Sequence, residues 1–555
     1  MTSTEVLVVG AGPVGLMAAG ELARRGVDVR LLERNDSRSS LSKALVIHAR
    51  TLEIMDLAGL AGEFGDRGYP APGIDVGLRR SGKPTPINLR GLDTRFPYML
   101  VLPQRETEAI LTRRLESLGV RIETGTEVIG LVQDDDKVTA TVRTATGDTQ
   151  VSARYLLGCD GAHSTVRELV QLPFEGVQLD STVLIGDVRV DTEFVRSRIT
   201  NFTSARGFVS ILPFLGDSVR IFAVDFARQD RTRDDALSLT ELQETVDAIS
   251  PLDMRLSDPT WLTRYVAPSR QVRTIRVGRT FLAGDATHAH SPAAGQGMNM
   301  GLQDAANLSW KLAMVLRREA PAGLLDTYDE ERHSVHGRVR HETDRMFRLF
   351  TLSNPVHKLV RDLAMRLLIP RKAVQQRLAG AVSGIALSYR QSRDFPASLV
   401  ARAHRTVIEV GDRVPDVHLW TAGRSEVRLH DLLREPGYAL IVHATADRLG
   451  RDRARIAKLF ADIAALYGDA VRRYLVIDEG VVDREFIGDV VLVDVRGEYA
   501  RKLGARHGTT IAVRPDGYLA AYSSSLSSAE VAQMLDRWCT GREIGAYRPD
   551  GRDNS

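Results

Sequence analysis

The clearest hydrophobic pattern lies at the N-terminus. Val6 to Val9 form a continuous apolar run, which is typical of a buried parallel strand. An apolar segment with helical spacing follows, and Gly26 is placed to cap that helix at its C-terminus. The residues VDVRLLE then predict a second strand that ends on Glu33. The order of strand, turn, helix and strand predicts the first βαβ unit of an α/β domain.

The turn of this unit has the composition of a phosphate-binding loop. Gly10, Gly12 and Gly15 give the G-x-G-x-x-G spacing directly after the first strand, and Pro13 suits the first turn of a helix. Glu33 lies eighteen residues after Gly15, where an acid can bind a ribose hydroxyl. Since a carboxylate would repel a 2′-phosphate, the pattern favours FAD or NAD over NADP at this site.

A second informative stretch is FLAGDATHAHSPAAGQGMNMGLQDAANLSWKL, residues 281–312. It predicts a buried strand that ends at Gly284 and Asp285, whose carboxylate can accept hydrogen bonds from ribityl hydroxyls. The Gly-Gln-Gly step that follows brings backbone N–H groups to the start of an apolar helix, where they suit the carbonyl edge of a flavin. Two histidines on alternate residues, His288 and His290, also suggest a metal site. Nothing nearby completes a ligand set and Pro292 interrupts the segment, so we expect no metal.

The rest of the chain divides by pattern into two further regions. Between about residues 177 and 273 the sequence is rich in predicted strands, such as RGFVSILPF and VRIFAVDF. The last 150 residues follow the β/α order of a thioredoxin fold. They lack a cysteine pair after the first strand, and Thr509 stands where a cis-proline is expected, so we expect packing or dimerisation and no dithiol chemistry.

Composition narrows the class of protein. The chain has 555 residues, 43% of them hydrophobic and 26% charged, and a net charge of +3, which suits two to four globular domains. No basic tract is evident, so we expect neither a nucleic-acid nor a membrane partner. The two cysteines, Cys159 and Cys539, have no metal or disulfide spacing, which indicates a cytoplasmic protein.

Three motifs in a fixed order carry a family resemblance. They are GAGPVG at residues 10–15, CDGAHSTVR at residues 159–167 and GDATHAHSPAAGQGMN at residues 284–299. Together they resemble the FAD-dependent aromatic hydroxylases, the single-component flavoprotein monooxygenases with the para-hydroxybenzoate hydroxylase fold. The resemblance extends to about Tyr389. The C-terminal region resembles that of phenol hydroxylase and of polyketide hydroxylases.

The resemblance implies an α/β architecture, α+β when the whole chain is considered. A Rossmann-like FAD-binding domain would comprise residues 1–75, 100–177 and 273–395. A β-sheet substrate domain would comprise residues 76–99 and 178–272, and would roof the substrate cavity. A linker at 396–410 would precede a thioredoxin-like domain at 411–545 that lacks the redox CxxC.

The resemblance also implies roles for matching positions. Arg50 would approach the flavin and contact the substrate or the peroxide oxygen. Lys43 stands where many members have arginine, which weakens the expectation of nicotinamide contact there. The cofactor-binding residues would be Gly10, Gly12, Pro13, Val14, Gly15, Glu33, Arg34, Lys43, Gln104, Arg105, Asp160, Arg167, Gly284, Asp285, Pro292, Gly295, Gln296, Gly297, Met298 and Asn299. Arg50 and Arg167 could instead simply pair with carboxylates.

The activity implied is NADPH- or NADH-dependent hydroxylation of a bulky polycyclic phenol or quinone. Tightly bound FAD would react with O2 to form a C4a-hydroperoxide, and the nicotinamide would bind only transiently. No general base can be named, because Asp225 and Arg220 in the roof are as readily expected to face solvent. Three alternatives stay open: a non-oxidative cyclase or isomerase on the same scaffold, a Baeyer–Villiger or epoxidising enzyme, and a non-catalytic scaffold. A homodimer is a further option.

Overall fold

The computed structural model describes residues 2–37, 42–78, 84–191, 197–214, 216–229, 235–289, 295–350, 352, 354–390, 408–421, 423–478, 490–536 and 538–539. The chain forms two compact units. Unit 1 comprises Met1–Ser309 and Tyr328–Arg405, and unit 2 comprises Trp310–Thr327 and Thr406–Ser555. Most of the predicted linker, and Pro292, lie outside the described residues. Among the described helices, none is both long and apolar enough to cross a membrane.

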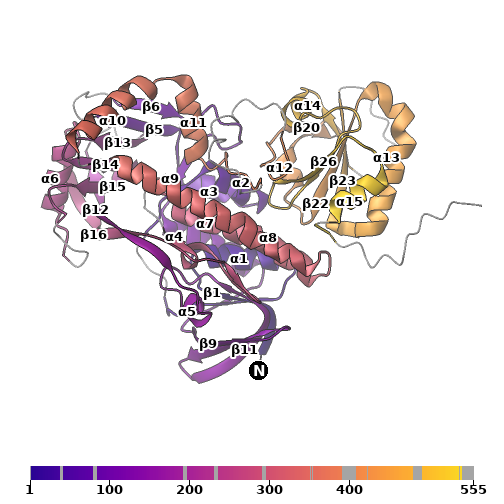
Figure 1. Ribbon diagram of the computed structural model, residues 1–555, viewed down its shortest axis with the longest axis horizontal. Helices are drawn as coiled ribbons and strands as arrows, with labels where there is room; N and C mark the ends of the chain where they lie inside the picture. The colour runs from indigo at the N-terminus through magenta and orange to yellow at the C-terminus, as the bar shows by residue number, and fades with distance from the viewer. Residues whose placement is uncertain are drawn as a thin grey trace, which may run out of the picture. The chain divides into compact units, whose positions relative to one another are not determined.

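The first sheet of unit 1 brings distant segments to one edge. Its path is β17-β18-β11-β1-β2-β8, and β10 joins β11 to β9. Strand β1 pairs in parallel with both β11 and β2, so the carboxyl ends of these three strands meet. The predicted strand at Val6–Val9 is confirmed within β1, and helix α1 (Pro13–Arg24) follows it (Figure 1). The strands are β1 (Thr2–Val9), β2 (Val29–Leu32), β8 (Ile122–Glu123), β9 (Glu127–Gln133), β10 (Val138–Thr144), β11 (Gly147–Gly158), β17 (Arg276–Val277) and β18 (Thr280–Leu282).

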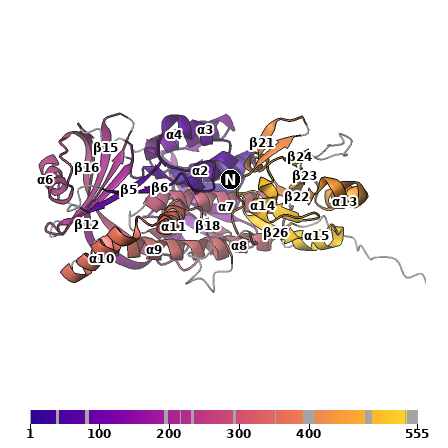
Figure 2. The same cartoon turned by 90° about the horizontal axis from the view of Figure 1, so that it is seen from above.

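The second sheet of unit 1 has the order β19-β16-β12-β15-β14-β13-β5-β6. One of its faces packs on helix α6 (Leu239–Ile249), whose apolar side joins Phe202 and Ile221 in a buried cluster. The other face carries residues such as Ile199 and Leu212, which pack towards helix α11 (Lys372–Val382) (Figure 2). The strands are β5 (Gly73–Leu78), β6 (Thr85–Asn88), β12 (Glu175–Val190), β13 (Ile199–Thr203), β14 (Gly207–Pro213), β15 (Ser218–Asp225), β16 (Leu256–Gln271) and β19 (His288–Ala289).

The remaining elements of unit 1 are a small sheet and a set of helices. A small sheet has the order β3-β7-β4, and helix α7 begins at Gln296 and continues through Ser309 into unit 2. These elements are β3 (Val46–Ile47), β4 (Tyr69–Ala71), β7 (Met99–Val101), α2 (Ala49–Leu57), α3 (Ala61–Arg67), α4 (Gln104–Ser117), α5 (Thr165–Leu169), α7 (Gln296–Leu316), α9 (Ser334–Phe350) and α10 (Pro355–Leu368).

Unit 2 is built on a sheet with the order β21-β20-β24-β23-β22-β25-β26. Its three middle strands, β22 to β24, are parallel; β25 pairs antiparallel with β22, and β26 pairs antiparallel with β25. The predicted β/α order is therefore observed, while the thioredoxin-like assignment stays a prediction. Its main elements are α8 (Asp326–Tyr328), which adjoins it in sequence, β20 (His418–Thr421), β21 (Glu426–Arg428), α12 (Leu429–Leu432), β22 (Tyr438–Ala444), α13 (Ala446–Tyr467), β23 (Val471–Asp478), β24 (Val490–Asp494), α14 (Glu498–Leu503), β25 (Thr510–Val513), β26 (Leu519–Ser523) and α15 (Ser528–Leu535).

Trp310 belongs to this unit although it lies on helix α7. Its ring is fully buried and meets Tyr438 of β22 edge to face, with ring centroids 5.7 Å apart. The guanidinium of Arg514 lies 5.2 Å from the Trp310 ring centroid. The last turns of α7 are therefore part of the core of unit 2, which the sequence did not predict.

Candidate active site

A large cavity of about 2540 Å³ lies in unit 1. One end is lined by the glycine-rich loop between β1 and α1, and the other by the second sheet. Drug-sized ligands occupy cavities of about 300 to 1,000 Å³, so this one can hold a large cofactor and a second molecule together. The predicted cofactor residues that line it are Gly10, Gly12, Pro13, Val14, Glu33, Arg34, Lys43, Gln104, Asp160, Arg167, Asp285, Gly295, Gln296, Gly297 and Met298.

Glycine suits each of the three positions in the loop for a different local reason. Gly10 has a φ of +99°, and a Cβ there would lie 2.6 Å from the carbonyl oxygen of Cys159. A Cβ on Gly15 would lie 1.9 Å from the carbonyl oxygen of Gly10, so this glycine allows α1 to approach the strand and does not line the cavity. A Cβ on Gly12 would meet no atom within 4 Å, since it would point into open space. The loop thus leaves room for a diphosphate at Gly12, beside the N-terminus of α1.

Glu33 is fixed at the edge of this loop. One carboxylate oxygen accepts a hydrogen bond from the Ala11 N–H at 2.8 Å, and the other accepts one from the Asn35 N–H at 3.0 Å. The side chain is half-buried and lines the cavity beside exposed Arg34. A carboxylate held there can also accept a hydrogen bond from a ribose hydroxyl, so the position fits the adenosine end of FAD.

The motif at residues 159–167 forms another part of the wall. Asp160 accepts hydrogen bonds from the Ser164 hydroxyl at 2.5 Å and from the Val166 N–H at 3.0 Å. Burial nevertheless raises the pKa of Asp160. Arg167 donates to the carbonyl oxygens of Ala162 and Ala286, and burial lowers the pKa of its guanidinium. The guanidinium of Arg167 thus bonds to backbone carbonyl oxygens, where an ion pair with a carboxylate was the alternative, and it joins α5 to the turn after β18.

The turn after β18 presents one exposed carboxylate to the cavity, that of Asp285. Gly284, with a φ of +63°, is buried behind it and does not line the cavity. The backbone at Gly295 to Met298 lines the cavity at the start of α7. Backbone N–H groups at a helix start suit a ring edge that gains negative charge, as the flavin expectation requires.

Asn299 has a structural position instead of a place in the cavity wall. Its side-chain amide donates to the carbonyl oxygens of Val46 and Gly295, at 2.8 Å each. Its side-chain oxygen accepts from the His48 N–H at 2.9 Å. The buried side chain therefore ties β3 and the start of α2 to the start of α7.

Of four further residues predicted for the site, two line the cavity and two do not. Lys43 and Gln104 line the cavity, and the Gln104 side-chain oxygen accepts from the Ala44 N–H at 3.0 Å. Arg105 is 63% exposed and outside the lining. Arg50 is fully buried, pairs with Glu53 at 2.9 Å and does not line the cavity, as the alternative of a carboxylate pair anticipated. A catalytic role for Arg50 stays an untested prediction.

Asp225 and Arg220, whose orientation the sequence left open, do not face solvent. Asp225 is 1% exposed and pairs with Arg206 at 2.6 Å. Arg220 is fully buried, pairs with Asp187 at 2.6 Å and donates to the carbonyl oxygen of Lys43 at 3.0 Å. Because Arg220 lies on the second sheet, this bond anchors the Lys43 segment to that sheet.

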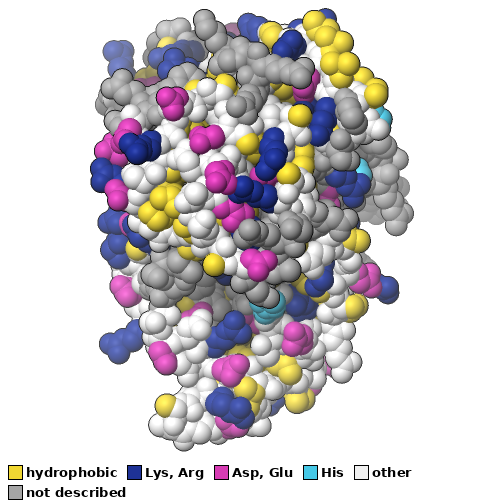
Figure 3. Space-filling model, turned by 90° about the vertical axis from the view of Figure 1, so that its left-hand side faces the viewer, with side chains coloured by type: hydrophobic (Ala, Val, Ile, Leu, Met, Phe, Trp, Pro, Cys, Tyr) yellow, Lys and Arg dark blue, Asp and Glu magenta, His cyan; other side chains and the backbone are white. Residues whose placement is uncertain are grey.

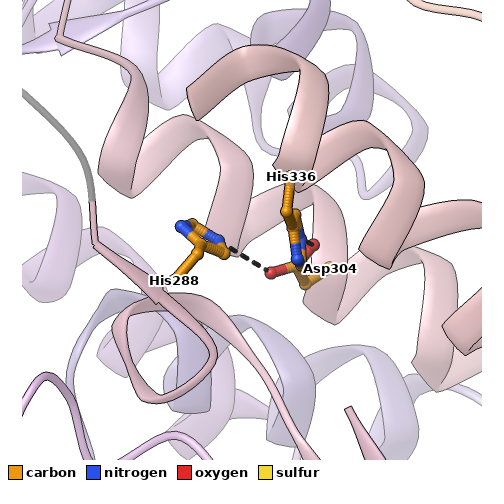
Figure 4. A group of neighbouring side chains, drawn as sticks. All are labelled: His288, Asp304 and His336. Carbon is orange, nitrogen blue, oxygen red and sulfur yellow. Dashed lines mark hydrogen bonds and ion pairs between the residues drawn. The ribbon is translucent and has the colours of Figure 1, made fainter. Parts of the chain in front are cut away.

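One buried carboxylate, missed in the sequence, organises the back of the site. Asp304 on α7 lies between His288 of β19 and His336 of α9 (Figure 4). One of its oxygens accepts from Arg332 and from His336 at 2.7 Å each, and the other accepts from the Gly284 N–H at 3.0 Å. Asp304 therefore holds the turn that presents Asp285. The sequence feature that could have revealed Asp304 is an acid on the buried side of an apolar helix.

The charges of this group disfavour a bound cation. Burial alone would raise the pKa of Asp304, but the hydrogen bond from His336 and the charge of Arg332 hold it well below its usual range. Burial lowers the pKa of His336 to about 3, so its imidazole is neutral. A cation would need to displace the Arg332 guanidinium from the carboxylate, although the three side chains are close enough to ligate one. We interpret the group as a hydrogen-bonded hub.

The cavity-facing side of the second sheet also contains polar residues that the sequence did not reveal. Asn201 pairs across strands with Ser210, and the same row continues through Phe222, Ile185 and Thr263. All five line the cavity. Within the described residues, neither Asn201 nor Ser210 makes a side-chain hydrogen bond to another protein group. Two adjacent polar side chains therefore face the cavity beside the apolar side chains of Phe222 and Ile185.

Comparison with known proteins agrees with this geometry. Residues 3–343 match a protein family described as FAD binding domain. The chain belongs to this FAD-binding family. It is an FAD-dependent monooxygenase related to the aromatic hydroxylases.

Three similar proteins show what this chain resembles. The 6-methylpretetramide 4-monooxygenase of Streptomyces rimosus is 35% identical over 528 residues, covering 93% of this chain and 90% of the relative. The structure of OxyS anhydrotetracycline hydroxylase from Streptomyces rimosus matches with a TM-score of 0.75 and 30% identity, covering 97% of this chain and 99% of that chain. The Diels-Alderase PyrE3 of the pyrroindomycin pathway matches with a TM-score of 0.71 and 27% identity, covering 98% and 100%.

Proposed function

We propose that this chain hydroxylates a bulky polycyclic phenol or quinone, with NADPH or NADH as the reductant. The observation that carries the proposal is the continuous cavity, which joins the diphosphate loop to the apolar face of the second sheet. Relatives named for 6-methylpretetramide and anhydrotetracycline support a substrate of that size.

The residues of the first sheet would bind FAD. Gly12 and the N-terminus of α1 would hold the diphosphate, Glu33 the adenosine ribose, and Asp285 the ribityl hydroxyls. When bound, FAD supplies the chemistry that the side chains lack, by accepting hydride and activating O2. The start of α7 would contact the ring.

The second sheet would exclude water from the reacting atoms. Its cavity-facing side chains include Ile185, Phe208, Leu212, Phe222 and Val224. Such a wall disfavours water near the ring, which protects an oxygen-activating cofactor from unproductive loss of reductant.

Asn201 and Ser210 would orient the substrate. Both side chains can donate and accept hydrogen bonds, and they lie side by side on β13 and β14. We propose that they bind a hydroxyl or carbonyl oxygen of the substrate and so select which ring carbon faces the flavin. Leaving them unpaired against a wholly apolar ligand would cost binding energy.

The test uses the purified yellow protein with NADPH or NADH, O2 and a panel of polycyclic phenols. We expect reductant consumption that depends on the substrate and a product one oxygen atom heavier. Reductant consumption that releases only hydrogen peroxide with every member of the panel would contradict the proposed substrate class.

A second candidate is non-oxidative ring formation, which the likeness to the Diels-Alderase PyrE3 favours. The same protein would then convert its substrate without NADPH and without O2, and the product would keep the substrate's mass. An anaerobic incubation without reductant separates the two functions. Baeyer–Villiger or epoxidising chemistry would be recognised from the structure of an oxygenated product.

A further inference from the structure

Helix α10 (Pro355–Leu368) exposes an apolar face. Val356, Leu359, Val360, Leu363 and Leu367 follow helical spacing and are between 56% and 68% exposed. Leu349, at the end of α9, and Leu368 extend the face, at 44% and 41% exposed. The space-filling view shows a run of hydrophobic side chains at its upper right, where α10 lies (Figure 3). Single exposed leucines are ordinary on proteins, but a contiguous patch marks an interaction surface.

The same segment concentrates positive charge. Residues 345–382 contain eight Lys and Arg and one Asp, a net charge of +7, so the remaining residues carry a net charge of −4 against the total of +3. The one acid, Asp362, pairs with Arg361 at 2.7 Å. Exposed basic side chains around the apolar face are Arg348, Arg366, Arg371, Lys372 and Arg377. The basic residues are spread over three helices, so the sequence showed no basic tract.

We propose that the surface formed by α10 and the start of α11 binds an anionic lipid bilayer, with α10 lying parallel to it. An apolar helix face bordered by cationic side chains is the pattern of interfacial helices. A second copy of this chain would bring the same positive charges against one another, whereas an anionic lipid surface complements them. With 14 residues, α10 is shorter than the roughly 20 residues that a membrane span needs.

The inner side of the same helix lines the candidate active-site cavity. Ala364, Met365 and Leu368 contribute to its wall, and Leu368 is also part of the exposed face. A bilayer at this surface would place an apolar substrate next to the cavity. This consequence rests on the proposed function, whereas the binding of the helix to lipid does not.

The experiment is sedimentation of the FAD-loaded protein with vesicles. Vesicles of phosphatidylcholine alone are compared with vesicles that also contain phosphatidylglycerol. We expect at least about tenfold tighter binding to the anionic vesicles, lost at high salt, because each basic side chain near the surface adds attraction. Leu359→Ser with Leu363→Ser should weaken that binding by roughly tenfold for each leucine removed from the apolar phase.

The matched control is Val132→Ser with Val177→Ser, which removes two exposed apolar side chains, 74% and 55% exposed, elsewhere in unit 1. The control should bind vesicles like the unchanged protein, and the bound-flavin absorbance confirms that every variant is folded. Absence of vesicle binding would overturn the proposal. Equal binding by the leucine variant would also overturn it, as would a dimer in solution that the leucine changes dissociate.

Discussion

The glycine-rich loop allows a paired test of what each glycine does. In Gly15→Ala the new Cβ would lie 1.9 Å from the carbonyl oxygen of Gly10, where no atom can fit. The backbone of β1 and α1 must then move apart, and overpacking of this kind costs about 1 to 3 kcal/mol or more of the free energy of unfolding. In Gly12→Ala the Cβ would meet nothing within 4 Å, and the residue has an ordinary φ of −72°. The free energy of unfolding of the FAD-free protein should then change by less than about 1 kcal/mol.

For cofactor binding the order of the two variants should be reversed, with Gly12→Ala having the larger effect. The Gly12→Ala methyl would occupy the space assigned to the diphosphate, so we expect a loss of at least about tenfold in FAD affinity, or roughly 1.4 kcal/mol. Flavin titration followed by fluorescence gives the affinity, and urea unfolding of the FAD-free protein gives the stability. If Gly12→Ala binds FAD as tightly as the unchanged protein, the diphosphate does not lie at this loop.

Three further predictions concern the hub, the substrate wall and the ribose contact. Because burial lowers the pKa of His336 to about 3, the unfolded chain takes up a proton first as pH falls below about 6.5. Stability should thus drop by about 1.4 kcal/mol between roughly pH 7.5 and 5.5, and less in His336→Asn; equal urea midpoints for flavin release across that range would refute this. Asn201→Leu should raise KM for an oxygenated substrate about tenfold or more by leaving one polar group unpaired, with Ser210→Ala having a similar effect, and an unchanged product pattern and KM would exclude orientation by this pair. Glu33→Gln should weaken FAD binding by about 1.5 to 3 kcal/mol, the range for a hydrogen bond to a charged group, and unaltered affinity in a flavin titration would remove Glu33 from the ribose site.

Local patterns were enough to predict the first sheet and its loop. The apolar run at Val6–Val9 and the glycine spacing depend on neighbours in sequence, and the structure has β1, the turn and α1 where these residues predict them. The long-range pairings were not accessible in the same way. Asn299 was expected at the cofactor, but its side chain bonds residues about 250 positions earlier, and nothing near Asn299 in sequence announces those partners.

Charged residues were the hardest to place from sequence. Arg220 and Asp225 occur in strands whose alternation gives the face of each residue but not what covers that face. The buried partners, Asp187 and Arg206, come from other strands or turns of the sheet. The role of Asp304 could not be predicted for the same reason, since its hydrogen-bond partners lie on three separate elements that only the folded chain brings together.

The ring of Trp310 bears on how this protein can be shortened. A chain ended after Arg405, the last residue of unit 1, would keep the tail of α7 while deleting both Tyr438 and Arg514. The buried indole of Trp310 would then be exposed to water, together with neighbouring apolar residues. Such a fragment should aggregate or lose the end of its helix, so the C-terminal region is better regarded as an integral partner of that helix than as a detachable appendage.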